Sequence, residues 1–163
     1  MNYKLLGCMA LLIMILIFPV SASLVSFLIV ETGLNEDIPS TQYGMLWEGG
    51  LMAGFFDSGR IVTNGPMTRM EEKPAKDLSG AIRFDFDDAV RGGADYFILC
   101  VLDHRLQGRR AIPVDITIRA YRTDTRELIF EQSFPVGRGR NQNEEFQNAQ
   151  SAGREIVSHI RNR

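Results

Sequence analysis

The chain has 163 residues, 45% of them hydrophobic, which suits one globular domain with a core and argues against a disordered tail. Its net charge of −2 hides an asymmetry: residues 1–102 carry 7 Lys and Arg against 12 Asp and Glu (−5), and residues 103–163 carry 11 against 8 (+3). The basic residues of the second half are all arginines and are spread out, which does not favour a nucleic-acid partner.

The hydrophobic start of the chain divides into two parts. A short segment, MNYK, precedes an apolar run at residues 5–20, and Pro19 interrupts that run before the small residues of SAS. This order is typical of a secretory signal peptide, so we predict a signal at residues 1–22 and a periplasmic or secreted domain at residues 23–163. The alternative is an uncleaved signal that anchors the chain in the inner membrane through residues 5–20.

The next segments indicate a strand, a helix and a second strand. LVSFLIVET is a short run rich in β-branched and aromatic residues, which predicts a buried strand. In YGMLWEGGLMAGFFDSG, Trp47, Leu51 and Phe55 recur every four residues with Met52 and Phe56 alongside, as in an amphipathic helix. Glycines in this helix lower its intrinsic stability, and we expect close packing on a sheet to compensate. RIVTNGP predicts a short strand, and TRMEEKPAK a charged loop.

The middle of the chain indicates a helix followed by a long apolar strand. Asp77 is the expected N-cap of DLSGAIRFDFDDAVRGG, whose apolar residues share one face and whose two final glycines end the helix. The apolar run of ADYFILCVLDH predicts a central strand, and RLQGRRAIP a loop.

The last third indicates a hairpin and a helix. In VDITIRAY, apolar residues alternate with polar ones, so we expect Val114, Ile116, Ile118 and Ala120 on a buried face and Arg119 on a wet one. RTDTR is the expected turn into ELIFEQSF, and NEEFQNAQSAGREIVSHIRNR the closing helix. The predicted fold is therefore an α/β (α+β) sandwich, β-α-β-α-β-β-β-α, with helices packed on a mixed sheet.

Several local sequences add a family resemblance: FLIVETG, FFDSGRIVTN, GADYFILCVL and the hairpin VDITIRAYRTDTRELIFEQSF. With this order of elements, residues 24–162 resemble the small α/β domain shared by the amino-terminal part of TolB, the periplasmic part of the curli secretion protein CsgG, and the lipoprotein activators of penicillin-binding proteins. The turn departs from the pattern, because Thr125-Arg126 stands where such domains often carry Thr-Gly. The resemblance implies a domain that docks on other envelope proteins and is not an enzyme.

Few side chains suggest catalysis. His104 follows Asp103 on a predicted strand, where neighbours point to opposite faces, so we expect a surface histidine rather than a catalytic pair. Cys100 lies within YFILCVL and is expected to be a buried apolar side chain. A small hydrolase that uses His104 or Cys100 is the alternative of another class. The acidic group of FDFDD predicts a solvated helix face rather than a metal site, because its carboxylates diverge around the helix. We expect no metal and no cofactor.

The arginines are the candidate binding residues. Arg105, Arg109 and Arg110 lie in the predicted loop, and Arg119 could join them in a patch for an acidic protein, a peptidoglycan carboxylate or lipid headgroups. Dispersed solubilising charge is the other interpretation. We therefore expect an exported, non-catalytic protein-interaction module whose partners are envelope proteins, an accessory of a secretion, cell-wall or flagellar complex.

Overall fold

The computed structural model describes residues 22–34, 42–108 and 110–161. Both interpretations of residues 5–20, as a signal peptide or as an anchor, concern a segment outside these ranges. Within them, no helix combines the length and the apolar character needed to cross a membrane. The elements in chain order are β1 (Leu24–Thr32), α2 (Gln42–Asp57), β2 (Ile61–Asn64), β3 (Thr68–Met70), α3 (Ile82–Arg91), β4 (Tyr96–Gln107), β5 (Arg110–Arg122), β6 (Leu128–Pro135) and α4 (Gln142–Arg161).

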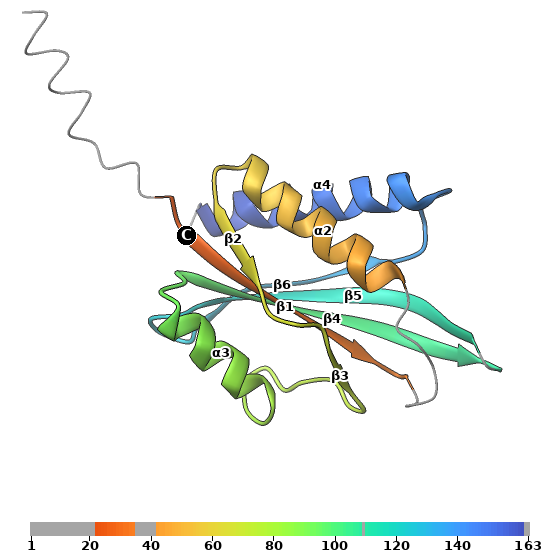
Figure 1. Cartoon of the computed structure of the whole chain (residues 1–163), viewed down its shortest axis with the longest axis horizontal. Helices are drawn as coiled ribbons and strands as arrows, with labels where there is room; N and C mark the ends of the chain where they lie inside the picture. The colour runs from red at the N-terminus through yellow and green to blue at the C-terminus, as the bar shows by residue number, and fades with distance from the viewer. Residues whose placement is uncertain (1–21, 35–41, 109, 162–163) are drawn as a thin grey trace, which may run out of the picture.

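The strands form one mixed sheet in the order β2-β1-β4-β5-β6, which confirms the predicted α/β sandwich (Figure 1). β1 runs parallel to β4, with Val25 opposite Tyr96 and Thr32 opposite Asp103. β4, β5 and β6 continue as an antiparallel meander. The first predicted strand is thus β1, in the middle of the parallel part of the sheet.

One strand was not predicted. β3 lies within the segment expected to be a charged loop, and it pairs with β1 in parallel beyond the point where β2 ends. β2 and β3 therefore follow the same edge of β1, separated by Gly65, Pro66 and Met67; Gly65 donates its backbone N–H to Phe27 O at 2.9 Å. Three residues are too few for an alternating pattern to reveal a strand.

Helices cover both faces of the sheet, as expected from the two strands that are apolar on both sides. α2 and α4 pack on one face, where they meet Phe27 and Ile29 of β1 and every second residue of β4. α3 covers the other face, where it meets Leu28 and Val30 of β1. Continuous apolar runs in β1 and β4 follow from this burial on both faces.

Gly49, Gly50 and Gly54 of α2 pack against a helix rather than a sheet, contrary to prediction. A Cβ on Gly50 would lie 2.6 Å from Ala149 Cβ, and one on Gly54 would lie 2.4 Å from Gln150 O, both in α4. Glycine at these positions lets the two helix backbones approach closely. Phe56, predicted beside the apolar stripe, is 68% exposed at the end of α2.

Helix α3 begins later than predicted. Asp77 is not its N-cap, since the helix starts at Ile82 and its N-cap position makes no side-chain hydrogen bond. The Asp77 carboxylate instead accepts the backbone N–H of Ser79 at 3.0 Å, within a turn that precedes the helix. The predicted end is confirmed, with Gly92 as the C-cap and Gly93 at φ 76°.

Glu145 connects the two helices of one layer to the loop before α4. It lies in the first turn of α4 and is 2% exposed. Its carboxylate accepts hydrogen bonds from Trp47 Nε1 and from the backbone N–H groups of Gly137 and Gly139, each at 2.8 Å. Three donors satisfy a buried carboxylate, so Glu145 fixes the position of α4 relative to α2.

Candidate functional site

A two-stranded arm extends the sheet where a loop was predicted. The expected loop at residues 105–113 is wrong, because β4 continues to Gln107 and β5 starts at Arg110, with Gly108 at φ 61° in the turn. β1 ends opposite Asp103, and β6 ends opposite Asp115. Residues 104–108 and 110–114, which we call the arm, therefore have no neighbouring strand among the described residues, and Figure 1 shows them projecting at one end of the molecule.

The arm brings two of the predicted arginines to one face. Arg105 is opposite Ile112, and Gln107 is opposite Arg110. Directly opposite residues of antiparallel strands share a face, so these four side chains lie together. Arg105 and Arg110 are exposed and make no hydrogen bond or ion pair within the described part of the chain. Ile112 beside them is 42% exposed. The third predicted arginine of this loop, Arg109, lies outside the described residues.

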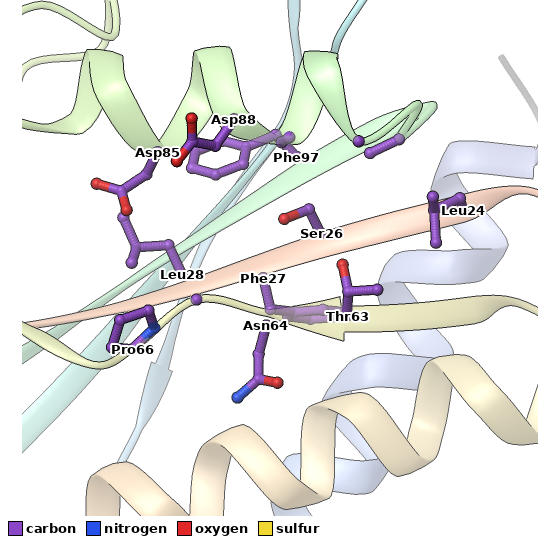
Figure 2. Close-up of a pocket in the computed structure, with 14 residues that line it drawn as sticks. Leu24, Ser26, Phe27, Leu28, Thr63, Asn64, Pro66, Asp85, Asp88 and Phe97 are labelled. Atoms are coloured by element: carbon purple, nitrogen blue, oxygen red, sulfur yellow. The ribbon is translucent and has the colours of Figure 1, made fainter.

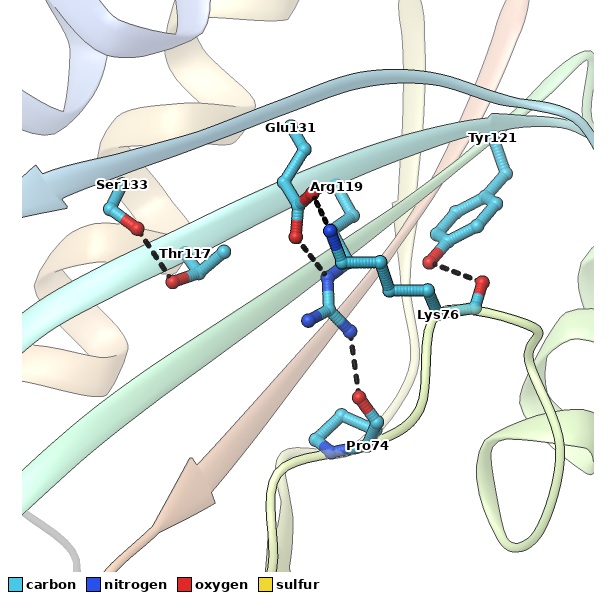
Figure 3. A network of polar contacts seen from close by, with 7 residues as sticks. All are labelled: Pro74, Lys76, Thr117, Arg119, Tyr121, Glu131 and Ser133. Atoms are coloured by element: carbon cyan, nitrogen blue, oxygen red, sulfur yellow. Dashed lines mark hydrogen bonds and ion pairs between the residues drawn. The ribbon is translucent and has the colours of Figure 1, made fainter.

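Arg119 does not belong to this surface, which corrects the sequence prediction. It is only 7% exposed, because the segment before α3 crosses the sheet face on which it lies. Its guanidinium donates to Glu131 Oε1 at 3.0 Å and to Pro74 O at 2.7 Å (Figure 3). Tyr121, two residues along β5, is fully buried and donates its hydroxyl to Lys76 O at 3.0 Å. Arg119 therefore attaches the covering segment to the sheet.

A buried polar cluster lies at the base of the arm. His104, expected on the surface, has a fully buried side chain; its Nδ1 donates to the backbone oxygen of Thr32 at 3.2 Å, and its Nε2 is 3.8 Å from Glu31 Oε1. Arg69 Nε lies 3.8 Å from the other carboxylate oxygen of Glu31. Neither Glu31 oxygen accepts a hydrogen bond from the part of the chain that the structure describes, and these cationic and ring groups help to offset the burial of the carboxylate. The cluster thus joins the end of β1 to Arg69 of β3 and His104 of β4.

Asp103 belongs to a different set of contacts from His104. A β-bulge separates the two residues; Asp103 accepts the Thr32 hydroxyl at 2.6 Å and lies 2.5 Å from Lys73 Nζ. Burial tends to raise the pKa of the Asp103 carboxyl, but the hydrogen bonds from Lys73 and Thr32 outweigh it and hold this pKa below its usual value. Asp103 and His104 are therefore not arranged as a catalytic pair.

The side chains suggested for a hydrolase have little access to a substrate. Cys100 is completely buried, and this burial raises the pKa of its thiol, which disfavours the reactive thiolate. His104 is 7% exposed, and Thr32, whose hydroxyl lies nearest to Asp103, is 2% exposed. These positions suit structural roles at the end of the sheet.

The carboxylates of FDFDD point to different surroundings. Asp87 lies 3.6 Å from Arg83 and 2.9 Å from Arg126, and Asp88 pairs with Arg91. Asp85 makes no ion pair among the residues that the structure describes. Burial raises the pKa of Asp85, and the nearby Asp88 adds to the effect. The three carboxylates do not converge on one point.

Asp85 and Asp88 border a groove between α3 and the β1–β2 edge of the sheet. This groove has a volume of about 240 Å³ and a largely apolar lining that includes Leu28, Ala89 and Phe97. Figure 2 shows the two carboxylates projecting from α3 over it. No local sequence pattern predicts this groove, because it arises from the pairing of β2 with β1.

Sequence comparisons find no matching protein family and no matching characterised protein. Similar solved structures include the PelC dodecamer from Paraburkholderia phytofirmans (12% identity, TM-score 0.45, 85% of this chain and 87% of that chain) and TolB from Acinetobacter baumannii (14%, 0.41, 86% and 28%). A lipoprotein from Neisseria meningitidis is also similar (12%, 0.42, 88% and 100%). TolB is thus among the similar folds, while the resemblance to CsgG and to penicillin-binding-protein activators stays a prediction. Identities and scores this low carry no argument about function.

Proposed function

We propose that this chain is an exported protein of the cell envelope that acts as a non-catalytic interaction module and binds an acidic surface of another protein through its arm. It would serve as an accessory of a larger envelope complex. The signal predicted at residues 1–22 supports export to the periplasm; retention of residues 5–20 as an anchor would leave the same domain on the same side of the membrane.

This proposal rests on the exposure of Arg105 and Arg110 and on their lack of an acidic partner within the described residues. Both lie on one face of the arm. The arm is a hairpin that extends beyond the rest of the sheet, so its side chains can reach a second surface without rearrangement of the core. Arginine suits such a contact, because its planar guanidinium binds carboxylates in a bidentate manner.

The test is recovery of proteins from an envelope extract on the affinity-tagged full-length chain. We expect the double variant Arg105→Glu, Arg110→Glu to lose a protein that the unmodified chain recovers. The matched control is Arg140→Glu, Arg154→Glu, which changes the net charge equally; both arginines are more than half exposed, one just before α4 and one on it. Equal recovery by all three chains would contradict the proposed role of the arm.

A further inference from the structure

We propose that the acidic surface bound by the arm is the groove between α3 and the β1–β2 edge of a second copy of this chain. The inference rests on the proposed binding role of the arm and names its partner. In this arrangement Arg105 and Arg110 of one copy approach Asp85 and Asp88 of the next, and Ile112 covers the apolar floor of the groove.

The groove and the arm are complementary in charge and in polarity. Asp85 has no internal cationic partner among the described residues, and the partial burial that raises the pKa of its carboxyl would be offset by an incoming guanidinium. Leu28 and Phe97 form an apolar floor beneath the carboxylates. The arm offers the matching combination of exposed arginines and a half-exposed isoleucine on one face. A basic hairpin with one apolar side chain is thus the occupant whose chemistry fits this groove.

The two surfaces cannot meet within one molecule. Phe97, in the groove, and Arg105, in the arm, are separated by eight residues of β4, or about 26 Å along the strand. Figure 1 shows the arm and α3 toward opposite ends of the sheet. Contact between them therefore requires two copies, either as a reciprocal pair in which each arm fills the groove of the other copy, or head to tail, which leaves one arm and one groove open at the ends. Repetition of the head-to-tail contact produces a ring or a filament.

The distribution of charge along the chain favours a second copy over an unrelated acidic protein. Residues 1–102, which contain the groove, sum to −5, whereas residues 103–163, which contain the arm, sum to +3. Contact between arm and groove places the exposed arginines of the arm against the carboxylates of the groove, and the small net charge of −2 gives little overall repulsion between copies.

Photo-crosslinking of the full-length chain in cells tests the inference. A photoreactive p-benzoylphenylalanine at Ile112 should give a covalent dimer of the chain, with the crosslinked peptide containing residues of β2 or α3. The same group at Phe56, which is 68% exposed but lies at the end of α2, should give no dimer. Crosslinks from position 112 only to other proteins would overturn the inference and leave the proposed function standing. Crosslinks to no protein at all would overturn both.

Exchange of charges tests whether the contact is the one described. In the chain that carries the photoreactive group at position 112, Arg105→Glu with Arg110→Glu should lower the dimer yield by roughly fivefold or more, because both charge pairs become repulsive. Co-expression with an Asp85→Lys, Asp88→Lys chain that lacks the photoreactive group should restore the dimer. An unchanged yield after the first substitution, or no recovery in the mixture, would overturn the pairing.

Discussion

Replacement of Arg119 by methionine should lower the free energy of unfolding by about 1–4 kcal/mol. Methionine keeps an apolar stem of similar length, so the main loss is polar. Without the guanidinium, the Pro74 carbonyl keeps its burial but loses its donor at 2.7 Å, which costs about 1–3 kcal/mol. The second lost contact, to Glu131, adds about 1 kcal/mol at most, because Glu131 is partly exposed and keeps its contact with Lys76.

The measurement is urea unfolding followed by far-ultraviolet circular dichroism, with Arg122→Met as the matched control. Arg122 lies three residues further along β5, and its ion pair with Asp124 is 4.0 Å long and exposed, so its loss should change stability by less than about 0.5 kcal/mol. If Arg119→Met proved as stable as Arg122→Met and instead lost its partner protein, Arg119 would be a binding residue, and its structural assignment would be refuted.

Three further outcomes follow from the packing and the titrating groups. Gly54→Ala should destabilise the protein by about 1–3 kcal/mol in the same urea assay, because its Cβ would lie 2.4 Å from a backbone oxygen of α4, whereas Gly49→Ala, with its nearest contact at 3.4 Å, should be neutral or stabilising. Cys100 should react with a thiol reagent only after unfolding; fast labelling of the native protein would show that the strand is accessible. The hydrogen bond from Lys76 lowers the pKa of Glu131 below its usual 4.5, so the stability that this carboxylate contributes is complete at neutral pH and is lost as the pH falls through the folded pKa. Lys76→Met should therefore flatten the decline of unfolding free energy between about pH 5 and pH 3, and an unchanged slope would exclude this linkage.

The elements that could be predicted from sequence are those with a strong local pattern. The apolar run at β1 predicted a buried strand, and this prediction is confirmed. A helix was predicted from the four-residue spacing of Trp47, Leu51 and Phe55, and it is also confirmed. The turn between β5 and β6 was also predicted, although Arg126 rather than glycine occupies its left-handed position at φ 60°. Local patterns were sufficient to predict the fold class. Strands that are apolar throughout must be covered on both faces, and helices with one apolar face must pack that face on a sheet.

The errors concern burial that depends on distant segments. The alternation of apolar and polar residues along β5 predicted that Arg119 is exposed to solvent. The segment before α3 instead crosses the sheet face on which Arg119 lies, and Pro74 O accepts its hydrogen bond. His104 is buried because Glu31 and Thr32, more than seventy residues earlier, meet it at the end of β1. The charge of Glu31 at the end of an apolar strand was the one local sign of this cluster. The arm was missed because its glycine and charged residues matched a loop, whereas cross-strand pairing determines its conformation.

The central claim is that the arm is the part of the protein that binds. Replacement of residues 105–112 by Asn-Gly removes the arm and leaves a two-residue hairpin turn between β4 and β5. The measurement is recovery of bound protein on this shortened chain, alongside its urea unfolding midpoint. The account predicts an almost unchanged midpoint with loss of the bound protein, and undiminished recovery by the folded, shortened chain would contradict it.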